Sequence, residues 1–370
     1  MTQKTITPST RIRTAIAMLA IGGLALTGCS IEGGSTGGAA AAKPAKAAAD
    51  CPIASEPDPG DAAVSSDVTF ATDAPKLEEK DTYKVAFSQN ANNGTWRIAE
   101  TDSMRDEAER LGYQIIVTDA QNNQSKQIQD IRTLIAQKPD AIFVAPITEQ
   151  IGSAVKEAAD AGIPVFLIDR TVSEDQAVAG TDFVTTIVSD FEQEGLRAGY
   201  ALARATGGTG KVLALEGTTG SSSAVDRANG FETALAECPG LEVVAAQDAD
   251  NQRSKAQDIT QSLLQAHPDV TAIYAQGDDM AMGAIAAIRG AGKIPGEDIL
   301  VVSGDGSKEA LQAIQNGEMA ANVECNPRFG PVAFETMKAY AAGDDIPTTI
   351  LNRDRIFDSS NVDEFVDDAY

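Results

Sequence analysis

Histidine is almost absent from this chain, and its absence removes several classes of site. The only histidine among the 370 residues, His267, stands directly before Pro268, a context typical of a loop between a helix and a strand. A Ser-His-Asp triad or a histidine-based metal site would have to use it. The four cysteines form no Cys-x-x-Cys pair. We therefore expect no metal, no cofactor and no triad chemistry.

Basic side chains are scarce as well. The chain has 29 Lys and Arg against 54 Asp and Glu, a formal net charge of -25. Nucleic acids and anionic lipid surfaces bind through a basic face, so we expect neither as a partner. With so many carboxylates, acidic pairs do not by themselves indicate acid–base catalysis. The segment 207–211 imitates a phosphate loop, but it precedes its strand and continues into Val212 instead of Ser or Thr. We predict that the chain is not an enzyme.

No apolar run is long enough to cross a bilayer, which takes about 20 residues. The longest uncharged apolar stretch near the start, residues 15–26, has twelve residues, follows a basic segment and leads into Leu26-Thr27-Gly28-Cys29. This pattern predicts a signal peptide at 1–28. The final four residues resemble the lipobox of bacterial lipoproteins, which implies cleavage before Cys29 and a lipid anchor on its thiol. An ordinary secreted protein is the alternative.

The residues after Cys29 are poor in large apolar side chains. Segment 29–80 is rich in Ala, Gly, Pro and Asp, a composition that buries too little apolar surface to offset chain entropy. We predict a flexible tether that holds a folded body outside the cytoplasm, on the membrane. Cys51, Cys238 and Cys325 allow one disulfide at most, and the sequence leaves their pairing open.

A different pattern begins after Asp81. Short apolar runs alternate with helical patterns, including those at 190–206, 222–237, 254–266 and 279–290. Runs that are apolar on both faces are typical of buried parallel strands. These runs lie at 85–87, 115–117, 141–144, 165–168, 212–215, 243–244, 272–274 and 299–302. About 290 residues of this kind exceed one ordinary core, which predicts an α/β protein with two doubly wound parallel-sheet lobes.

Polar residues that directly follow the strands carry the functional information, because ligands of open parallel sheets bind at the carboxyl ends of strands. Ser88 and Gln89 end the first run, Asp169 and Arg170 follow the fourth, and Asp305 follows the last. For Asp169 and Arg170 alone, a structural salt bridge and a binding element are equally open interpretations.

Several longer stretches resemble the type I periplasmic sugar-binding proteins, the ribose-binding-protein-like receptors of ABC transporters. They are Asp119-Ala120-Gln121-Asn122-Asn123, the run 163–170, Asp226-Arg227-Ala228-Asn229-Gly230-Phe231 and the run 275–284. Gly94-Thr95-Trp96-Arg97 is most similar to the galactofuranose-binding branch. The resemblance implies two lobes joined by three crossing strands, with lobe one at 82–188 plus 326–353 and lobe two at 189–325 plus 354–370.

The resemblance also implies a function. A monomeric receptor would bind a monosaccharide, with a furanose such as galactofuranose favoured, and deliver it to the permease of an ABC importer. A sugar sensor or a receptor for another small ligand would use the same fold. The ligand-binding residues implied are Ser88, Gln89, Trp96, Arg97, Asp169, Arg170, Arg227 and Asp305. Trp96 would supply an aromatic face for the sugar, unless it is a core residue.

The chain departs from the family pattern at three positions. Gly277 and Ala145 stand where the family commonly has asparagine, and Cys325 stands where ribose binders have glutamine. These losses argue against ribose and leave room for a larger or differently shaped furanose.

Overall fold

The computed structural model describes residues 51–60 and 69–370, which belong to one unit, Pro44–Tyr370. The predicted signal peptide at 1–28, the lipid anchor Cys29 and the first part of the predicted tether lie outside the described residues. Among the residues described, no helix is both long and apolar enough to span a membrane.

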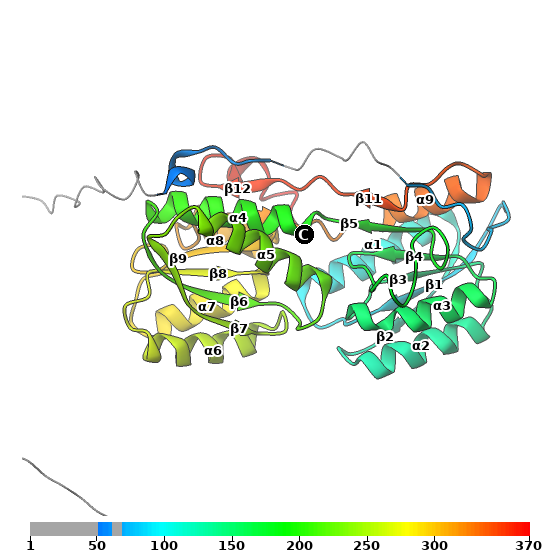
Figure 1. The fold of residues 1–370 in the computed structure, drawn as a ribbon, viewed down its shortest axis with the longest axis horizontal. Coiled ribbons are helices and arrows are strands. Elements are labelled where there is room, and N and C mark those ends of the chain that lie inside the picture. Colours follow the sequence, from blue (N-terminus) through cyan, green and yellow to red (C-terminus); the bar gives the residue numbers. More distant parts are fainter. Residues whose placement is uncertain (1–50, 61–68) are drawn as a thin grey trace, which may run out of the picture. The chain divides into compact units, whose positions relative to one another are not determined.

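The described residues form two six-stranded sheets, and the first of them builds lobe one, with the strand order β11-β5-β4-β3-β1-β2 (Figure 1). Each neighbouring pair of strands is parallel. Helices α1 and α9 pack on one face, and α2 and α3 pack on the other. The strands are β1 (Lys84–Gln89), β2 (Gln114–Asp119), β3 (Ala141–Val144), β4 (Val165–Ile168), β5 (Thr185–Val188) and β11 (Thr349–Leu351), and the helices are α1 (Thr95–Leu111), α2 (Gln124–Ala136), α3 (Gly152–Asp160) and α9 (Gly330–Ala342).

The second sheet forms lobe two, with the order β12-β10-β9-β8-β6-β7. Its pairs are parallel except β10 with β12, which is antiparallel. Helices α4 and α5 cover one face, and α6, α7 and α8 cover the other. The strands are β6 (Gly210–Glu216), β7 (Leu241–Asp248), β8 (Ala272–Ala275), β9 (Leu300–Asp305), β10 (Ala321–Glu324) and β12 (Ile356–Asp358), and the helices are α4 (Phe191–Thr206), α5 (Ser222–Ala236), α6 (Arg253–Ala266), α7 (Asp278–Gly290) and α8 (Lys308–Gln315).

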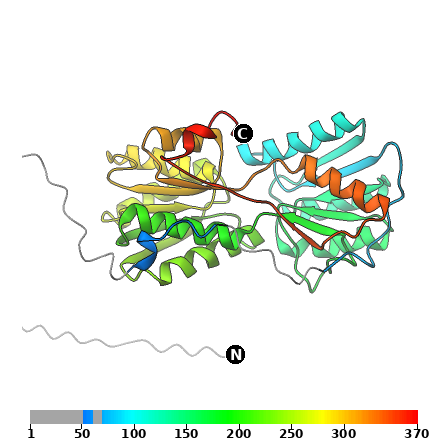
Figure 2. The same ribbon diagram turned by 90° about the horizontal axis from the view of Figure 1, so that it is seen from above.

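The predicted fold class, two doubly wound α/β lobes, is confirmed. The chain passes between the two sheets after β5, again after β10 and finally after β11 (Figure 2). Strands β3 and β4 are buried along their whole length, as their continuous apolar runs predicted. Helix α1 ends at Gly112, whose φ of 72° is the left-handed conformation that glycine adopts without a steric cost.

The prediction of a flexible tether over 29–80 is wrong for the described residues before β1. Cys51 forms a disulfide with Cys238, two residues after the end of α5, and Ile53 is fully buried beside it. Asp58 pairs with Arg197 of α4 at 2.8 Å. Residues 69–80 pack on lobe one, where Leu77 is buried. A covalent link and a few buried apolar side chains therefore order a segment whose average composition is that of a flexible chain.

Candidate functional site

A small cavity of about 60 Å³ lies between the two lobes. In the same measure a single water molecule needs roughly 10–15 Å³, so the cavity suits a small molecule and not a polymer. Residues from both lobes line it. They are Asn93, Gly94, Trp96, Arg97, Asp169, Arg170, Ser223, Arg227, Asn251, Gly277, Asp279, Met280, Asp305 and Cys325.

The position of the cavity follows from the topology of the two sheets. Asp169 and Arg170 directly follow β4, while Trp96 and Arg97 stand in the first turn of α1, which follows β1. In lobe two, Asp305 is the last residue of β9. The carboxyl ends of parallel strands and the helices that follow them meet at one edge of a sheet, and the two edges face each other across the cavity.

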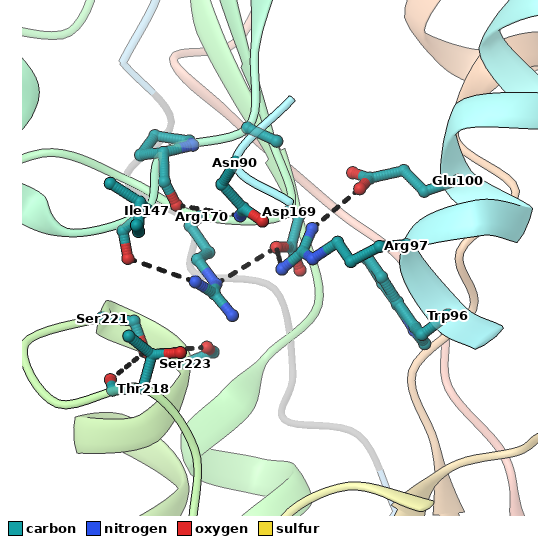
Figure 3. A network of polar contacts seen from close by, with 12 residues as sticks. Asn90, Trp96, Arg97, Glu100, Ile147, Asp169, Arg170, Thr218, Ser221 and Ser223 are labelled. Carbon is teal, nitrogen blue, oxygen red and sulfur yellow. Dashed lines mark hydrogen bonds and ion pairs between the residues drawn. The ribbon is translucent and has the colours of Figure 1, made fainter. Parts of the chain in front are cut away.

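In lobe one, Asp169 holds two guanidinium groups beside the cavity (Figure 3). Its Oδ2 lies 2.5 Å from Nη2 of Arg97 and 3.2 Å from Nε of Arg170. Arg97 also bonds Glu100 at 2.7 Å, and Arg170 donates to the carbonyl of Ile147 at 3.2 Å. The φ of Asp169 is 67°, in the left-handed region that residues with a side chain rarely adopt. In this conformation its carboxylate contacts both Arg97 and Arg170.

Burial controls the ionisation of this cluster. It raises the pKa of Glu100 to about 7, although Arg97 opposes the shift. Burial also lowers the pKa of Arg170 to about 10, and the positive charge of Arg97 adds to that effect. Arg170 stays protonated at neutral pH. It is therefore a buried cation beside the cavity that can donate to a ligand oxygen.

In lobe two, Arg227 is the buried arginine that lines the cavity. Its Nε bonds Glu194 at 2.6 Å, Nη1 donates to the carbonyl of Gln276 at 2.8 Å, and Nη2 lies 3.4 Å from Oδ1 of Asp305. Its guanidinium lies over the ring of Phe191, 5.1 Å from the centroid. Burial raises the pKa of Asp305 to about 8 and that of Glu194 to about 8, against the attraction of Arg227.

Trp96 belongs both to the cavity wall and to the core of lobe one. Only 9% of its surface is exposed, and its Nε1 donates to the carbonyl of Cys325 at 2.7 Å. The edge of Phe329 packs against its ring at 6.1 Å between centroids, and the guanidinium of Arg97 lies 4.4 Å from the ring centroid. The structure therefore makes Trp96 a core residue that also lines the cavity.

Six of the eight predicted site residues line the cavity, but Ser88 and Gln89 do not. Consecutive strand residues point to opposite faces of a sheet, so these two side chains face helices and not the cavity. Gln89 donates to Glu100 at 2.9 Å, and Ser88 lies 3.5 Å from Gln127 of α2. Gln89 thus supports Glu100, which in turn holds Arg97.

Several lining residues were not predicted from the sequence, chiefly Asn93, Ser223 and Asn251. They stand in loops or in the first turn of a helix, where polar residues are common, so no local signal sets them apart. Asp279 and Met280 lie within a stretch that resembles the family, and that resemblance was the one signal that could have marked them.

Comparison with known proteins agrees with this geometry. Residues 85–345 match the model of the periplasmic binding protein domain. The galactofuranose-binding protein YtfQ of Escherichia coli is 37% identical over 269 residues, 71% of this chain and 83% of that protein. The ribose import binding protein RbsB of Escherichia coli is 35% identical over 285 residues, 76% and 92% of the two chains. A Mycobacterium smegmatis structure in complex with β-D-fucofuranose has a TM-score of 0.73 and 35% identity, covering 77% of this chain and 93% of that one.

The fold is that of a two-lobed binding protein, and the cavity between the lobes is its candidate ligand site. The chain belongs to the periplasmic binding protein family. Its relatives are binding proteins, and like them the chain is not an enzyme. The family predicted from the sequence motifs is confirmed.

Proposed function

We propose that the protein binds a monosaccharide, with a furanose ring favoured, and delivers it to an ABC importer. The observation that carries this proposal is the pairing of arginine with carboxylate on both sides of the cavity, Arg170 with Asp169 and Arg227 with Asp305. Carboxylates accept hydrogen bonds from sugar hydroxyls, and guanidinium groups donate hydrogen bonds to the hydroxyl oxygens. Hydrogen bonds to such charged groups are stronger than hydrogen bonds between neutral groups. Trp96 offers an apolar surface for the C–H face of the sugar.

The pairing of the arginines supports a neutral ligand. Each arginine of the lining already has an acidic partner in the protein: Asp169 contacts Arg97 and Arg170, and Glu194 and Asp305 contact Arg227. A phosphate or a sugar acid would have to displace these partners to pair with a guanidinium group, whereas sugar hydroxyls can bind beside them. The ionisable residues of the lining are Arg97, Arg170 and Arg227, and Asp169, Asp279 and Asp305.

Two of the relatives support a furanose, because one is named for galactofuranose and the other holds β-D-fucofuranose. Gly277 adds a local argument. A Cβ atom at this position would stand 2.9 Å from Oδ2 of Asp305, so a side chain here would displace that carboxylate and fill part of the cavity. The absence of a side chain at Gly277 leaves room beside Asp305 for a group attached to the sugar ring. Galactofuranose, which carries such a group, is the first choice.

Calorimetric titration tests the ligand class. D-Galactose, L-arabinose, D-ribose and D-glucose would each be added to the ligand-free protein. We expect D-galactose or L-arabinose to bind, and D-glucose, which in water holds almost no furanose, to bind far more weakly. An exposed-charge variant, Asp258→Ala, serves as the control for protein quality. If none of the four sugars shows a heat of binding, or if D-glucose binds most tightly, the furanose proposal is wrong.

The proposal also places the protein outside the cytoplasm, held on the membrane by a lipid on Cys29 and acting as a monomer. The pattern Leu26-Thr27-Gly28-Cys29 after a short apolar run supports the anchor. Fractionation of cells tests it: the protein should sediment with membranes, and Cys29→Ser should release it with its sugar affinity unchanged. A processed Cys29→Ser protein that stays on the membrane would overturn the anchor.

A further inference from the structure

One carboxylate of lobe two caps a helix of lobe one. Asp279 stands in the first turn of α7, yet its Oδ2 accepts from the backbone N–H of Thr95 at 3.1 Å. Thr95 is the first residue of α1, and the residue before it, Gly94, has no side chain to offer as a cap. The first N–H groups of a helix need an acceptor, usually the side chain of the N-cap residue. For α1 this acceptor comes from the opposite lobe.

The absence of a side chain at Gly94 is what admits this carboxylate. A Cβ atom there would lie 2.9 Å from Oδ2 of Asp279, closer than such atoms approach. Helix α7 offers a contrast, because its N-cap, Gly277, is also a glycine. The N–H of Asp278 donates to Asp305 of the same lobe at 3.0 Å. The cap of α7 therefore survives a separation of the lobes, whereas the cap of α1 does not.

Asp279 is held in position from within its own lobe. Arg253, the first residue of α6, donates to Oδ1 from Nη2 at 3.0 Å and from Nε at 3.3 Å. Arg253 is in turn fixed by Glu309 of α8, at 2.6 Å. The other carboxylate oxygen, Oδ2, is left for Thr95. The carboxylate of Asp279 is thus held in place within lobe two, and the N–H of Thr95 in lobe one binds its second oxygen.

We propose that Asp279 is a latch that stabilises the closed arrangement of the lobes. The two residues after Thr95 are Trp96 and Arg97, which line the cavity, so the same bond positions them for the ligand. This part rests on the proposed sugar-binding function. Because this hydrogen bond must break before the lobes can open, it slows the release of a bound sugar. Association starts from the open form, in which this bond is absent, so the bond acts by stabilising the closed form and not by speeding the first contact with the sugar.

Four variants separate the latch from other roles of Asp279. Asp279→Ala removes it, and Arg253→Ala, a change outside the cavity lining, loosens it. Gly94→Ser combined with Asp279→Ala gives α1 a cap within its own lobe, because the carboxylate that opposed a side chain there is gone. Asp258→Ala, an exposed carboxylate of α6, is the matched control.

Two readouts apply to each variant. Spin labels on exposed helix positions, Gln129→Cys of α2 and Gln261→Cys of α6, report the ratio of closed to open lobes in the ligand-free protein. Stopped-flow dilution reports the dissociation rate of D-galactose. Asp279→Ala should lower the ratio, and raise the dissociation rate, by roughly two- to thirty-fold, the range expected for the loss of one helix cap. Arg253→Ala should move both in the same direction by less.

The double variant decides what the bond does. We expect Gly94→Ser with Asp279→Ala to leave dissociation fast, because its cap no longer joins the lobes. Full recovery would show that the bond only orders α1, and would overturn the latch. Agreement of Asp279→Ala with Asp258→Ala in both readouts would also overturn it. The spin-label ratio needs no sugar, so failure of the furanose proposal is distinguishable from failure of the latch.

Discussion

Replacing Trp96 should cost both stability and sugar affinity, because its ring serves the core and the cavity at once. In Trp96→Ala, lobe one loses a side chain that is 9% exposed and packs on Phe329. Truncations of this kind cost about 3–5 kcal/mol. For lobes of this size, 1 kcal/mol moves the melting temperature by about 2–4 °C, so we expect a fall of roughly 6–20 °C.

Trp96→Phe separates the two roles. It keeps an aromatic ring but removes the donor to the carbonyl of Cys325, and a buried acceptor left unpaired costs about 1–3 kcal/mol. The melting temperature of the ligand-free protein should therefore fall less than in Trp96→Ala. Sugar affinity should fall little in Trp96→Phe. In Trp96→Ala it should fall on the order of tenfold, since aromatic contacts contribute about 0.5–1.5 kcal/mol beyond the buried area.

Differential scanning calorimetry and isothermal titration on the same preparations make the comparison. The double role of the ring is refuted if Trp96→Ala destabilises the ligand-free protein by the expected amount but binds sugar as the wild type does. In that case the ring would be a core residue only. An unchanged melting temperature of ligand-free Trp96→Ala would refute the claim that the ring belongs to the core.

Three further predictions concern the ion pairs and the disulfide. Asp169→Asn removes the charge that holds Arg97 at 2.5 Å, and calorimetry should show an affinity loss of about 1.5–3 kcal/mol; a change below twofold would contradict the assignment. Replacing Cys51 and Cys238 together by serine should lower stability by about 2–5 kcal/mol in denaturant titrations, and two thiols that react freely in the unmodified folded protein would disprove the bridge. The pKa of Asp305 is raised by burial to about 8, so the folded protein keeps a proton that the unfolded chain releases near pH ~3.9, and stability should fall as pH rises from about 4 to about 8. Asp305→Asn should flatten that fall in melting temperature, and an equal slope in both proteins would show that Asp305 does not cause it.

The sequence predicted the framework of the fold because its central strands are buried on both faces. Runs such as 141–144 and 165–168 have no polar interruption, and the structure makes them central strands, β3 and β4. The residues that follow such strands must lie at the sheet edge, which is why the sequence alone could place Asp169 and Asp305 there. The short strands β5, β10, β11 and β12 carry no comparable run and were not predicted.

The site was less predictable where it depends on contacts between distant segments. Gln89 is the last residue of β1, close to the sheet edge where Asp169 lies, but its side chain turns toward Thr101 of α1. The local sequence does not reveal that direction. The cap of α1 requires Asp279, a residue 184 positions away from Thr95. The docking of residues 51–60 depends on Cys238 in the same way, whereas composition reports only an average tendency toward flexibility.

A crystal structure of the protein grown with D-galactose tests the central claim most directly, because the protein itself selects one ring form from those present in solution. We predict a furanose in the cavity, with Asp169 and Arg170 on one side and Arg227 and Asp305 on the other. A pyranose ring in that place would contradict the furanose assignment. A sugar bound to one lobe only, or outside the cavity, would contradict the binding site itself.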